Sequence, residues 1–115
     1  EARAARSYEA TYFDYDKANI RDDQKAALTQ SADKLKAHAD AKVTLEGHCD
    51  ERGTAEYNLA LGQKRADSAK AFLTKAGVAA DRIKTLSLGK ARPADAGHSE
   101  AAWAKNRRVE IVAAP

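Results

Sequence analysis

The sequence lacks several features that would assign it to a function class at once. Its single cysteine, Cys49, excludes an internal disulfide bond and leaves the redox compartment open. No apolar run approaches the length of a membrane span. Aromatic residues make up 6% of the chain, and like charges are not gathered in blocks. Recognition of nucleic acid, which needs basic patches and stacking platforms, therefore has little support, and we expect no nucleic-acid partner.

Methionine is also absent, and no secretory signal peptide is recognisable. The chain opens on EARAARSYEA. We therefore expect a processed piece of a longer protein, with any targeting segment or membrane anchor upstream of Glu1.

The composition that remains is that of one small folded unit. With 115 residues, 43% hydrophobic and 32% charged, the chain suits one compact domain with a modest core. Its 20 basic and 17 acidic residues are spread along the chain and give a net charge of +3, which is typical of a solvated mixed surface. Residues 1–7 are predicted to be the end of a linker, and residues 8–115 to be the domain.

Strand-like and helix-like segments alternate along the domain. Strands are predicted at residues 8–13, 42–48, 82–88 and 107–113, and helices at 22–40, 54–76 and, as a short one, 101–105. The order β-α-β-α-β-(α)-β predicts an α+β fold: a two-layer sandwich with a mixed four-stranded sheet and helices packed on one face.

The two long helices each carry an apolar stripe. In the first helix the stripe is Leu28, Ala32, Leu35 and Ala39; in the second it is Leu59, Gly62, Ala66, Ala69, Leu73 and Ala76. The second stripe consists mostly of small residues, so this helix is expected to lie close to the sheet, and Gly77 is its stop signal. In the last strand, Val109 and Ile111 are expected to point inward.

Polar residues crowd the connection between the second strand and the second long helix. It reads HCDERG, residues 48–53. A solvated turn needs only a glycine and one or two polar residues, so the surplus suggests chemistry. Loops that leave strand ends often hold ligands, and this loop is a candidate site.

Three separated motifs then identify a family. They are YFDYDKANI, VTLEGHCDERGTAEYNLALGQKRADSAKAFL and LGKARPADAGHSEAAWAKNRRVEI, which together span roughly nine tenths of the chain. The chain resembles the OmpA-like peptidoglycan-binding domains and, through DERGTAEYN, their peptidoglycan-associated lipoprotein (Pal) branch.

The resemblance implies a domain that is not an enzyme and needs no cofactor or metal. It implies a lipid-anchored protein at the periplasmic face of the outer membrane of a Gram-negative cell, which tethers that membrane to peptidoglycan as part of a Tol-Pal system. A TolB-like periplasmic protein is implied as a partner, over a surface that overlaps the wall site. Other OmpA-like carriers, namely an outer-membrane porin or a motor stator, remain alternatives.

The resemblance also implies a ligand and its contacts. Asp50 and Arg65 stand where the family grips the ammonium and the carboxylate of meso-diaminopimelate in the stem peptide, and both residue types suit those charges. Further matching positions are Phe13, Asp14, Arg52, Thr54, Tyr57, Asn58 and Leu61. Cys49 departs from the alanine or threonine more usual there, and we interpret it as an inert spacer.

Each of these residues also has a plain structural interpretation. Asp50 and Arg65 could form an ordinary internal salt bridge. Asp14 and Asp16 could end a strand and cap a turn. His48 alternates with buried positions and could be a sheet-face residue with a structural hydrogen bond.

Catalysis is a rival interpretation of the same loop. Asp14 or Asp50 could pair with Glu51 as acid and base on a glycan. The positive charges of Arg52 and Arg65 would keep such carboxylates ionised, which opposes the general-acid role.

Metal binding is a second rival interpretation. His48, Asp50 and the distant His98 offer three ligands, although their spacing is weak compared with known zinc motifs. At the other end of the chain, Asn106, Arg107 and Arg108 either start a solvated strand or brace the loops around the site, and the sequence leaves both possibilities open.

Overall fold

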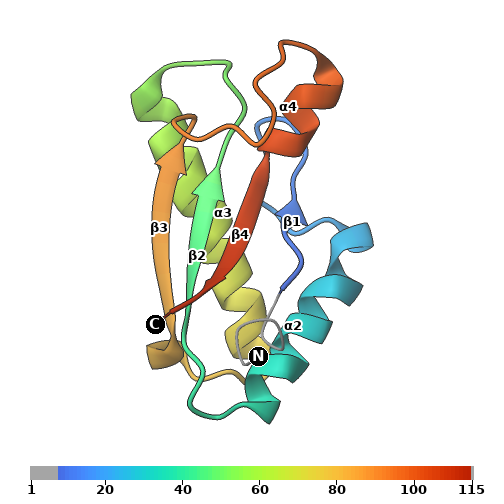
Figure 1. Ribbon diagram of the computed structural model, residues 1–115, viewed down its shortest axis with the longest axis vertical. Coiled ribbons are helices and arrows are strands. Elements are labelled where there is room, and N and C mark those ends of the chain that lie inside the picture. The colour runs from blue at the N-terminus through green and yellow to red at the C-terminus, as the bar shows by residue number, and fades with distance from the viewer. Residues whose placement is uncertain (1–7, 115) are drawn as a thin grey trace.

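The computed structural model describes residues 8–114, so the linker end predicted at residues 1–7 lies outside the described residues. The elements run in the order β1 (Thr11–Tyr12), η1 (Asp22–Gln24), α2 (Lys25–Ala37), β2 (Val43–His48), α3 (Ala55–Lys75), η2 (Ala80–Arg82), β3 (Ile83–Gly89), α4 (Glu100–Asn106) and β4 (Arg108–Ala113), as Figure 1 shows.

The four strands form one mixed sheet in the order β1-β4-β2-β3. β2 is central: it pairs antiparallel with β4 and parallel with β3, and β1 pairs antiparallel with β4. β2 and β3 are parallel because α3 carries the chain back along the sheet between them, as a parallel pair requires. The α+β prediction, with a mixed four-stranded sheet, is confirmed.

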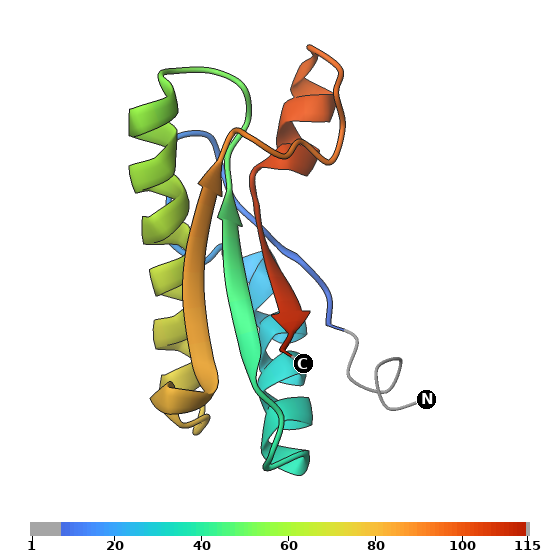
Figure 2. The same cartoon turned by 60° about the vertical axis from the view of Figure 1, so that its left-hand side comes forward.

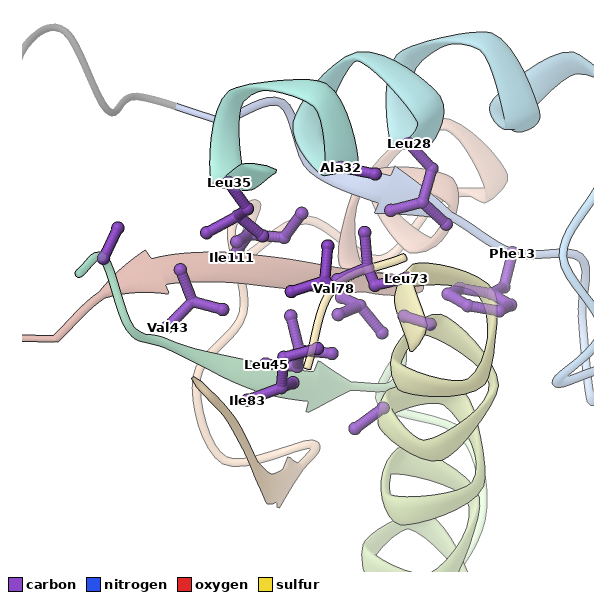
Figure 3. Close-up of a cluster of buried hydrophobic side chains, with 14 residues drawn as sticks. Phe13, Leu28, Ala32, Leu35, Val43, Leu45, Leu73, Val78, Ile83 and Ile111 are labelled. Atoms are coloured by element: carbon purple, nitrogen blue, oxygen red, sulfur yellow. The ribbon is translucent and has the colours of Figure 1, made fainter. Parts of the chain in front are cut away.

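The helices α2 and α3 bury one face of this sheet, and α3 runs behind the strands in Figure 1 and alongside them in Figure 2. Figure 3 shows the side chains that fill the space between the layers. They include Leu28, Ala32 and Leu35 from α2, Leu73 from α3, Val43 and Leu45 from β2, Ile83 from β3, and Val109 and Ile111 from β4. The inward orientation expected for Val109 and Ile111 is confirmed.

Helix α3 begins and ends at residues that the sequence indicated as local start and stop signals. Thr54 is the N-cap, and its hydroxyl accepts a hydrogen bond from the Tyr57 N–H. Gly77, with φ of 110°, follows the last turn in the left-handed region that stops a helix. Although α3 has 21 residues, none of the described helices is both long and apolar enough to cross a membrane.

Two glycines set how closely α3 approaches the sheet. A Cβ atom on Gly47 of β2 would lie 1.8 Å from the carbonyl oxygen of Gly62, and one on Gly62 would lie 2.4 Å from Ser87 Oγ and 2.9 Å from the Gly47 carbonyl oxygen. The helix and the strand therefore touch backbone to backbone at this point, as the small-residue stripe predicted.

Several predicted boundaries and faces are wrong. The first strand spans Thr11–Tyr12 and not residues 8–13, and the first helix is preceded by the 3-10 turn η1 and ends at Ala37, so Ala39 is exposed outside it. Leu59 is also exposed, although it lies on α3 next to Gly89 at the end of β3. The short helix predicted at 101–105 is confirmed, one residue longer at each end.

Candidate ligand-binding site

A small pocket lies where the β2–α3 loop, the start of α3 and the segment after β1 meet. Its volume is about 50 Å³, and it is lined by Tyr15, Asp16, Cys49, Asp50, Arg52, Gly53, Tyr57, Asn58, Leu61 and Arg65. We call it the polar pocket. A volume of this size exceeds the roughly 10–15 Å³ that one water needs, so it suits the charged end of a side chain and not a whole sugar ring.

Asp50 is the buried acid of the polar pocket, with 5% of its surface exposed. Its Oδ1 accepts hydrogen bonds from the backbone N–H and Nε of Arg52, at 3.0 and 3.2 Å. Its Oδ2 accepts from Arg52 Nη2 at 2.8 Å and from Arg107 Nη1 at 3.5 Å. Burial alone would raise the pKa of Asp50, but the hydrogen bonds from Arg52 outweigh it and the pKa is lowered. The carboxylate is therefore ionised at neutral pH.

Arg52 is held between two aromatic rings while it binds Asp50. Its guanidinium carbon lies 3.9 Å from the centre of the Tyr15 ring and 4.2 Å from that of Trp103. Cation-π contacts on both faces, together with the bidentate carboxylate, fix the plane of the guanidinium. The Arg52 side chain binds Asp50 through Nε and Nη2 and not through Nη1. The two N–H groups of Nη1 therefore remain available as oriented donors at the lining of the pocket.

Arg65 lies deeper, with 1% of its surface exposed. Its Nε donates to the Lys17 carbonyl at 2.8 Å, Nη1 to the His48 carbonyl at 2.9 Å and Nη2 to the Asp14 carbonyl at 3.1 Å. A guanidinium carries five N–H groups, so one on Nη1 and one on Nη2 remain beyond these three bonds. Burial lowers the pKa of Arg65. The charge of Arg107 adds a smaller effect in the same direction, and Cys49 and Asp50 oppose it.

The remaining pocket residues are held by their own contacts. The Tyr57 hydroxyl bonds to the Asp16 carboxylate, which joins α3 to the segment after β1. Asn58 Nδ2 donates to the Arg52 carbonyl at 2.8 Å, and Gly53 adopts a φ of 94° in the turn between them. The Cys49 thiol donates to the Asn58 carbonyl at 3.3 Å, and burial raises its pKa to about 11.

The polar pocket gathers six of the nine site residues that the sequence indicated: Asp50, Arg65, Arg52, Tyr57, Asn58 and Leu61. Three others support it from outside. Phe13 is buried under Arg65, with 5.3 Å between its ring centre and the guanidinium carbon. The Asp14 carbonyl accepts a hydrogen bond from Arg65, while the Asp14 carboxylate pairs with Arg21. Thr54 caps the N-terminus of α3.

Sequence reasoning missed Tyr15, Asp16 and Trp103 as parts of the site, whereas Gly53 belongs to the candidate loop at residues 48–53. Tyr15 and Asp16 follow directly on the predicted Phe13 and Asp14, so their position in the chain was a usable signal. No sequence signal marked Trp103, because it lies on α4, far along the chain, and only the tertiary fold brings it to Arg52.

Two of the structural interpretations do not hold among residues 8–114. Asp50 pairs with Arg52 and Arg107, and no salt bridge joins it to Arg65. His48 is a buried sheet-face residue as expected, but neither ring nitrogen has a hydrogen bond within the described chain. The metal set His48, Asp50 and His98 is not assembled either, because His98 binds Glu51.

The junction of α4 and β4, which consists of Asn106, Arg107 and Arg108, braces the loops, and the alternative of a solvated strand start is wrong because all three side chains are buried. Asn106 Oδ1 accepts from the N–H groups of Ala94 and Asp95, at 2.7 and 2.9 Å. Arg107 donates to the Phe13 carbonyl at 2.9 Å and to Asp50. Arg108 bonds to the carbonyls of residues 92 and 106.

Glu51 points away from Asp50, toward α4. Its carboxylate accepts from Trp103 Nε1 at 2.7 Å and contacts His98 Nδ1 at 2.7 Å. These hydrogen bonds lower the pKa of Glu51, and the bond from Trp103 has the larger effect. Both carboxyls of the predicted acid-base pair are thus held in the ionised form.

Comparison with known proteins assigns this fold and site to a family. The chain belongs to the OmpA family, whose family model matches residues 12–107. It is 48% identical over 105 residues to the peptidoglycan-associated lipoprotein of Pasteurella multocida, covering 91% of this chain and 70% of that protein. It is 44% identical over 108 residues to the peptidoglycan-associated lipoprotein of Pseudomonas aeruginosa, covering 94% of this chain and 64% of that protein.

A solved structure agrees with this assignment. The crystal structure of the peptidoglycan-associated lipoprotein from Burkholderia pseudomallei superimposes with a TM-score of 0.88 at 45% identity, covering 91% of this chain and 89% of that one. The predicted resemblance to the OmpA-like domains and their Pal branch is thereby confirmed.

Proposed function

We propose that the domain binds peptidoglycan non-covalently by holding the meso-diaminopimelate side chain of a stem peptide in the polar pocket. The observation that carries the proposal is the presence of an ionised carboxylate and two guanidinium groups around one cavity of about 50 Å³. The free end of meso-diaminopimelate carries one ammonium and one carboxylate, so it complements these charges. The names of the relatives support peptidoglycan as the polymer to which this ligand belongs.

In this proposal Asp50 holds the ligand ammonium. Its contact with Arg107 is the longest of the four it makes, at 3.5 Å, so the Oδ2 atom is the side of the carboxylate with the weakest existing partner. An ammonium that bonds to Oδ2 leaves the bidentate pair with Arg52 in place.

The ligand carboxylate is then held by Arg52 and Arg65. Arg52 offers its Nη1, in a plane fixed by Tyr15 and Trp103, and Arg65 offers the N–H groups that remain beyond its three carbonyl bonds. Tyr57, Asn58 and Leu61 line the pocket beside the ligand, while Phe13, Asp14 and Thr54 position the residues that line it. Both guanidinium groups are ordered before binding, which lowers the entropic cost of capture.

The same geometry supports binding without catalysis. General acid chemistry on a glycan needs one carboxyl with a raised pKa. The pKa values of Asp50 and Glu51 are both lowered, and the two groups bond to different partners. We therefore propose a domain that holds the wall and does not cleave it.

At the scale of the cell we propose a tether between the outer membrane and the wall. The domain would stand at the periplasmic face of the outer membrane, anchored through lipid as the name of the relatives implies for them. A TolB-like periplasmic partner, competing for the same surface, completes the proposed Tol-Pal role.

Pull-down with purified sacculi, followed by titration with a defined muropeptide, tests the proposal. We expect retention of the unchanged domain, loss of retention for Asp50→Asn, and full retention for Asp81→Asn, a matched change on the exposed η2 turn. No retention of the unchanged domain, or retention of Asp50→Asn equal to that of Asp81→Asn, would refute it. Soluble fragments released from sacculi by the unchanged domain but not by Asp50→Asn would show an enzyme instead.

A further inference from the structure

A second cluster of ligand-type side chains lies on the sheet face that α2 and α3 do not cover. Glu46 and His48 are two residues apart on β2 and so share a face, opposite to the core residues Val43 and Leu45. Glu110 of β4 is the direct cross-strand partner of Glu46. One nitrogen of the imidazole and one oxygen of each carboxylate lie within 4.8 Å of one another.

His48 is the unusual member of this cluster. Only 2% of it is exposed, and neither Nδ1 nor Nε2 has a hydrogen-bond partner among the described residues. Its Nε2 faces Glu46, 3.5 Å from Oε1. A buried imidazole without partners costs free energy that a bound ion at Nε2 would offset.

The two carboxylates supply a second reason for a cation. Like charges directly opposite each other on neighbouring strands destabilise the pair. Arg108 relieves part of this repulsion, since its Nε donates to Glu110 Oε2 at 2.6 Å. Glu46 receives no such bond from Arg108 among the described contacts, and Glu110 Oε1 stays available.

We propose that Glu46, His48 and Glu110 form a binding site for a divalent transition-metal ion, with zinc as its first candidate. Zinc takes imidazole nitrogen and carboxylate oxygen at about 2.0–2.2 Å, which places neighbouring ligand atoms of a tetrahedral site about 3.3–3.6 Å apart. The present spacing therefore needs the two partly exposed carboxylates to close on the fixed imidazole. Three protein ligands leave the fourth position of a tetrahedral ion to solvent.

The protonation state of the cluster suits this ion. Burial, and after it the charge of Arg108, lowers the pKa of His48, so the ring is neutral at pH 7 and its nitrogen is free to bind metal. The signal was visible in the sequence as the alternation E-x-H in one strand and a glutamate in another, but only the register of β2 and β4 brings them together.

The test is zinc titration of the full chain, stripped of metal by a chelator, followed by calorimetry and thermal unfolding. To remove the other two imidazoles, the titration uses a His38→Gln/His98→Gln background, since His98 next to Glu51 is a rival surface site. We expect one zinc per chain, a rise in Tm on zinc addition, and a loss of affinity of about tenfold or more for Glu46→Gln and for Glu110→Gln. Glu56→Gln, an exposed change on α3, should leave affinity unchanged.

Both test substitutions fall on partly exposed side chains, so the variants should fold, and circular dichroism without zinc checks this. Cobalt in place of zinc should give no thiolate charge-transfer band, which excludes Cys49 as a ligand. The proposal is overturned if zinc fails to bind at micromolar concentration, if the double-histidine background abolishes binding, or if Glu46→Gln and Glu110→Gln bind as tightly as Glu56→Gln.

Discussion

At the scale of single residues, Arg65 joins two segments that are distant in sequence. The carbonyls of Asp14 and Lys17 belong to the loop after β1, and that of His48 to the end of β2, yet all three accept from one guanidinium. The buried charge is thus satisfied largely by backbone oxygens. Removing the side chain would leave these carbonyls unsatisfied in a buried place.

We therefore predict that Arg65→Ala destabilises the fold by about 3–5 kcal/mol, because it removes three charge-assisted hydrogen bonds at once. Urea unfolding measures this loss. Arg92→Ala, a matched change at an exposed loop residue, should alter the free energy of unfolding by less than about 0.5 kcal/mol. If Arg65→Ala is as stable as Arg92→Ala, the carbonyl contacts contribute nothing to the fold.

Cys49 is expected to be unreactive in the folded chain. With a pKa of about 11, its thiolate is present in about one molecule in a thousand at pH 8, and only 3% of the residue is exposed. A thiol reagent such as Ellman's should react slowly in buffer and rapidly in urea. Cys49→Ala should retain sacculus binding, whereas fast labelling of the native chain would show an accessible thiolate.

His48 should make stability fall in mild acid. Its pKa is lowered in the folded chain, by burial first and then by Arg108, against the opposing effects of Glu110 and Glu46. Below the unfolded value of 6.5 the unfolded chain binds more protons than the folded one, so the free energy of unfolding decreases as pH falls, by at most about 1.4 kcal/mol per pH unit.

Urea unfolding in the presence of a chelator, at about pH 7.5 and about pH 5, measures this effect. His48→Gln should show a smaller decrease than the unchanged chain, and the control His38→Gln, at a half-buried position, should show the full decrease. Equal pH dependence in all three proteins would mean that His48 titrates as it does when unfolded.

At the scale of the elements, the contact between α3 and β2 depends on having no side chain at two positions. Gly47→Ala would place a Cβ atom 1.8 Å from the Gly62 carbonyl oxygen, so the helix must move away from the sheet. We expect destabilisation of about 3 kcal/mol or more, measured by thermal or urea unfolding. Gly97→Ala is the control: its Cβ atom would lie 3.1 Å from Asp95 Oδ1 and 3.3 Å from the Ala102 Cβ, which are contacts with side chains and not with backbone, so it should cost less. Similar values for both would contradict the close approach.

The elements themselves could be predicted where local signals coincide. α3 was placed within one residue at each end because a Thr54 cap, a small-residue stripe and Gly77 agree. The predicted first strand is too long, since the aromatic and β-branched content of residues 8–13 as a whole is strand-like but the pairing with β4 covers only Thr11 and Tyr12. Leu59 fits the helical period, yet it lies beside Gly89 at the very end of β3 and stays exposed, and periodicity carries no information on where a neighbouring element stops.

The candidate site could be predicted where it lies along one stretch of sequence. The β2–α3 loop and the start of α3 supply Asp50, Arg52, Tyr57 and other residues from consecutive positions, and the family motif marked them. The stacking of Arg52 between Tyr15 and Trp103 could not be predicted, because it joins three segments through tertiary contacts.

At the scale of the whole molecule, the site lies where the sheet ends and three connections meet. Arg107 ties the Phe13 carbonyl to Asp50 and Glu100, and Asn106 fixes the loop at residues 94–95, so the end of α4 and the start of β4 brace the loops around the polar pocket. The charges of the pocket are thus set in place by the fold before a ligand arrives. Recognition should therefore depend on the charge pattern of the ligand more than on its size.

Selectivity between two stem peptides tests this dependence on ligand charge. Lysine in place of meso-diaminopimelate keeps the ammonium and loses the carboxylate, so we expect binding weaker by about tenfold or more, because Arg52 and Arg65 lose their partner. Arg52→Gln should weaken binding of the diaminopimelate peptide and leave the lysine peptide nearly unchanged, since the coupling vanishes when either group is absent. Calorimetry measures all four affinities, with Lys75→Gln as a distant control for charge. Equal affinity for both peptides, or equal harm to both from Arg52→Gln, would show that the guanidinium groups support the pocket and do not read the ligand.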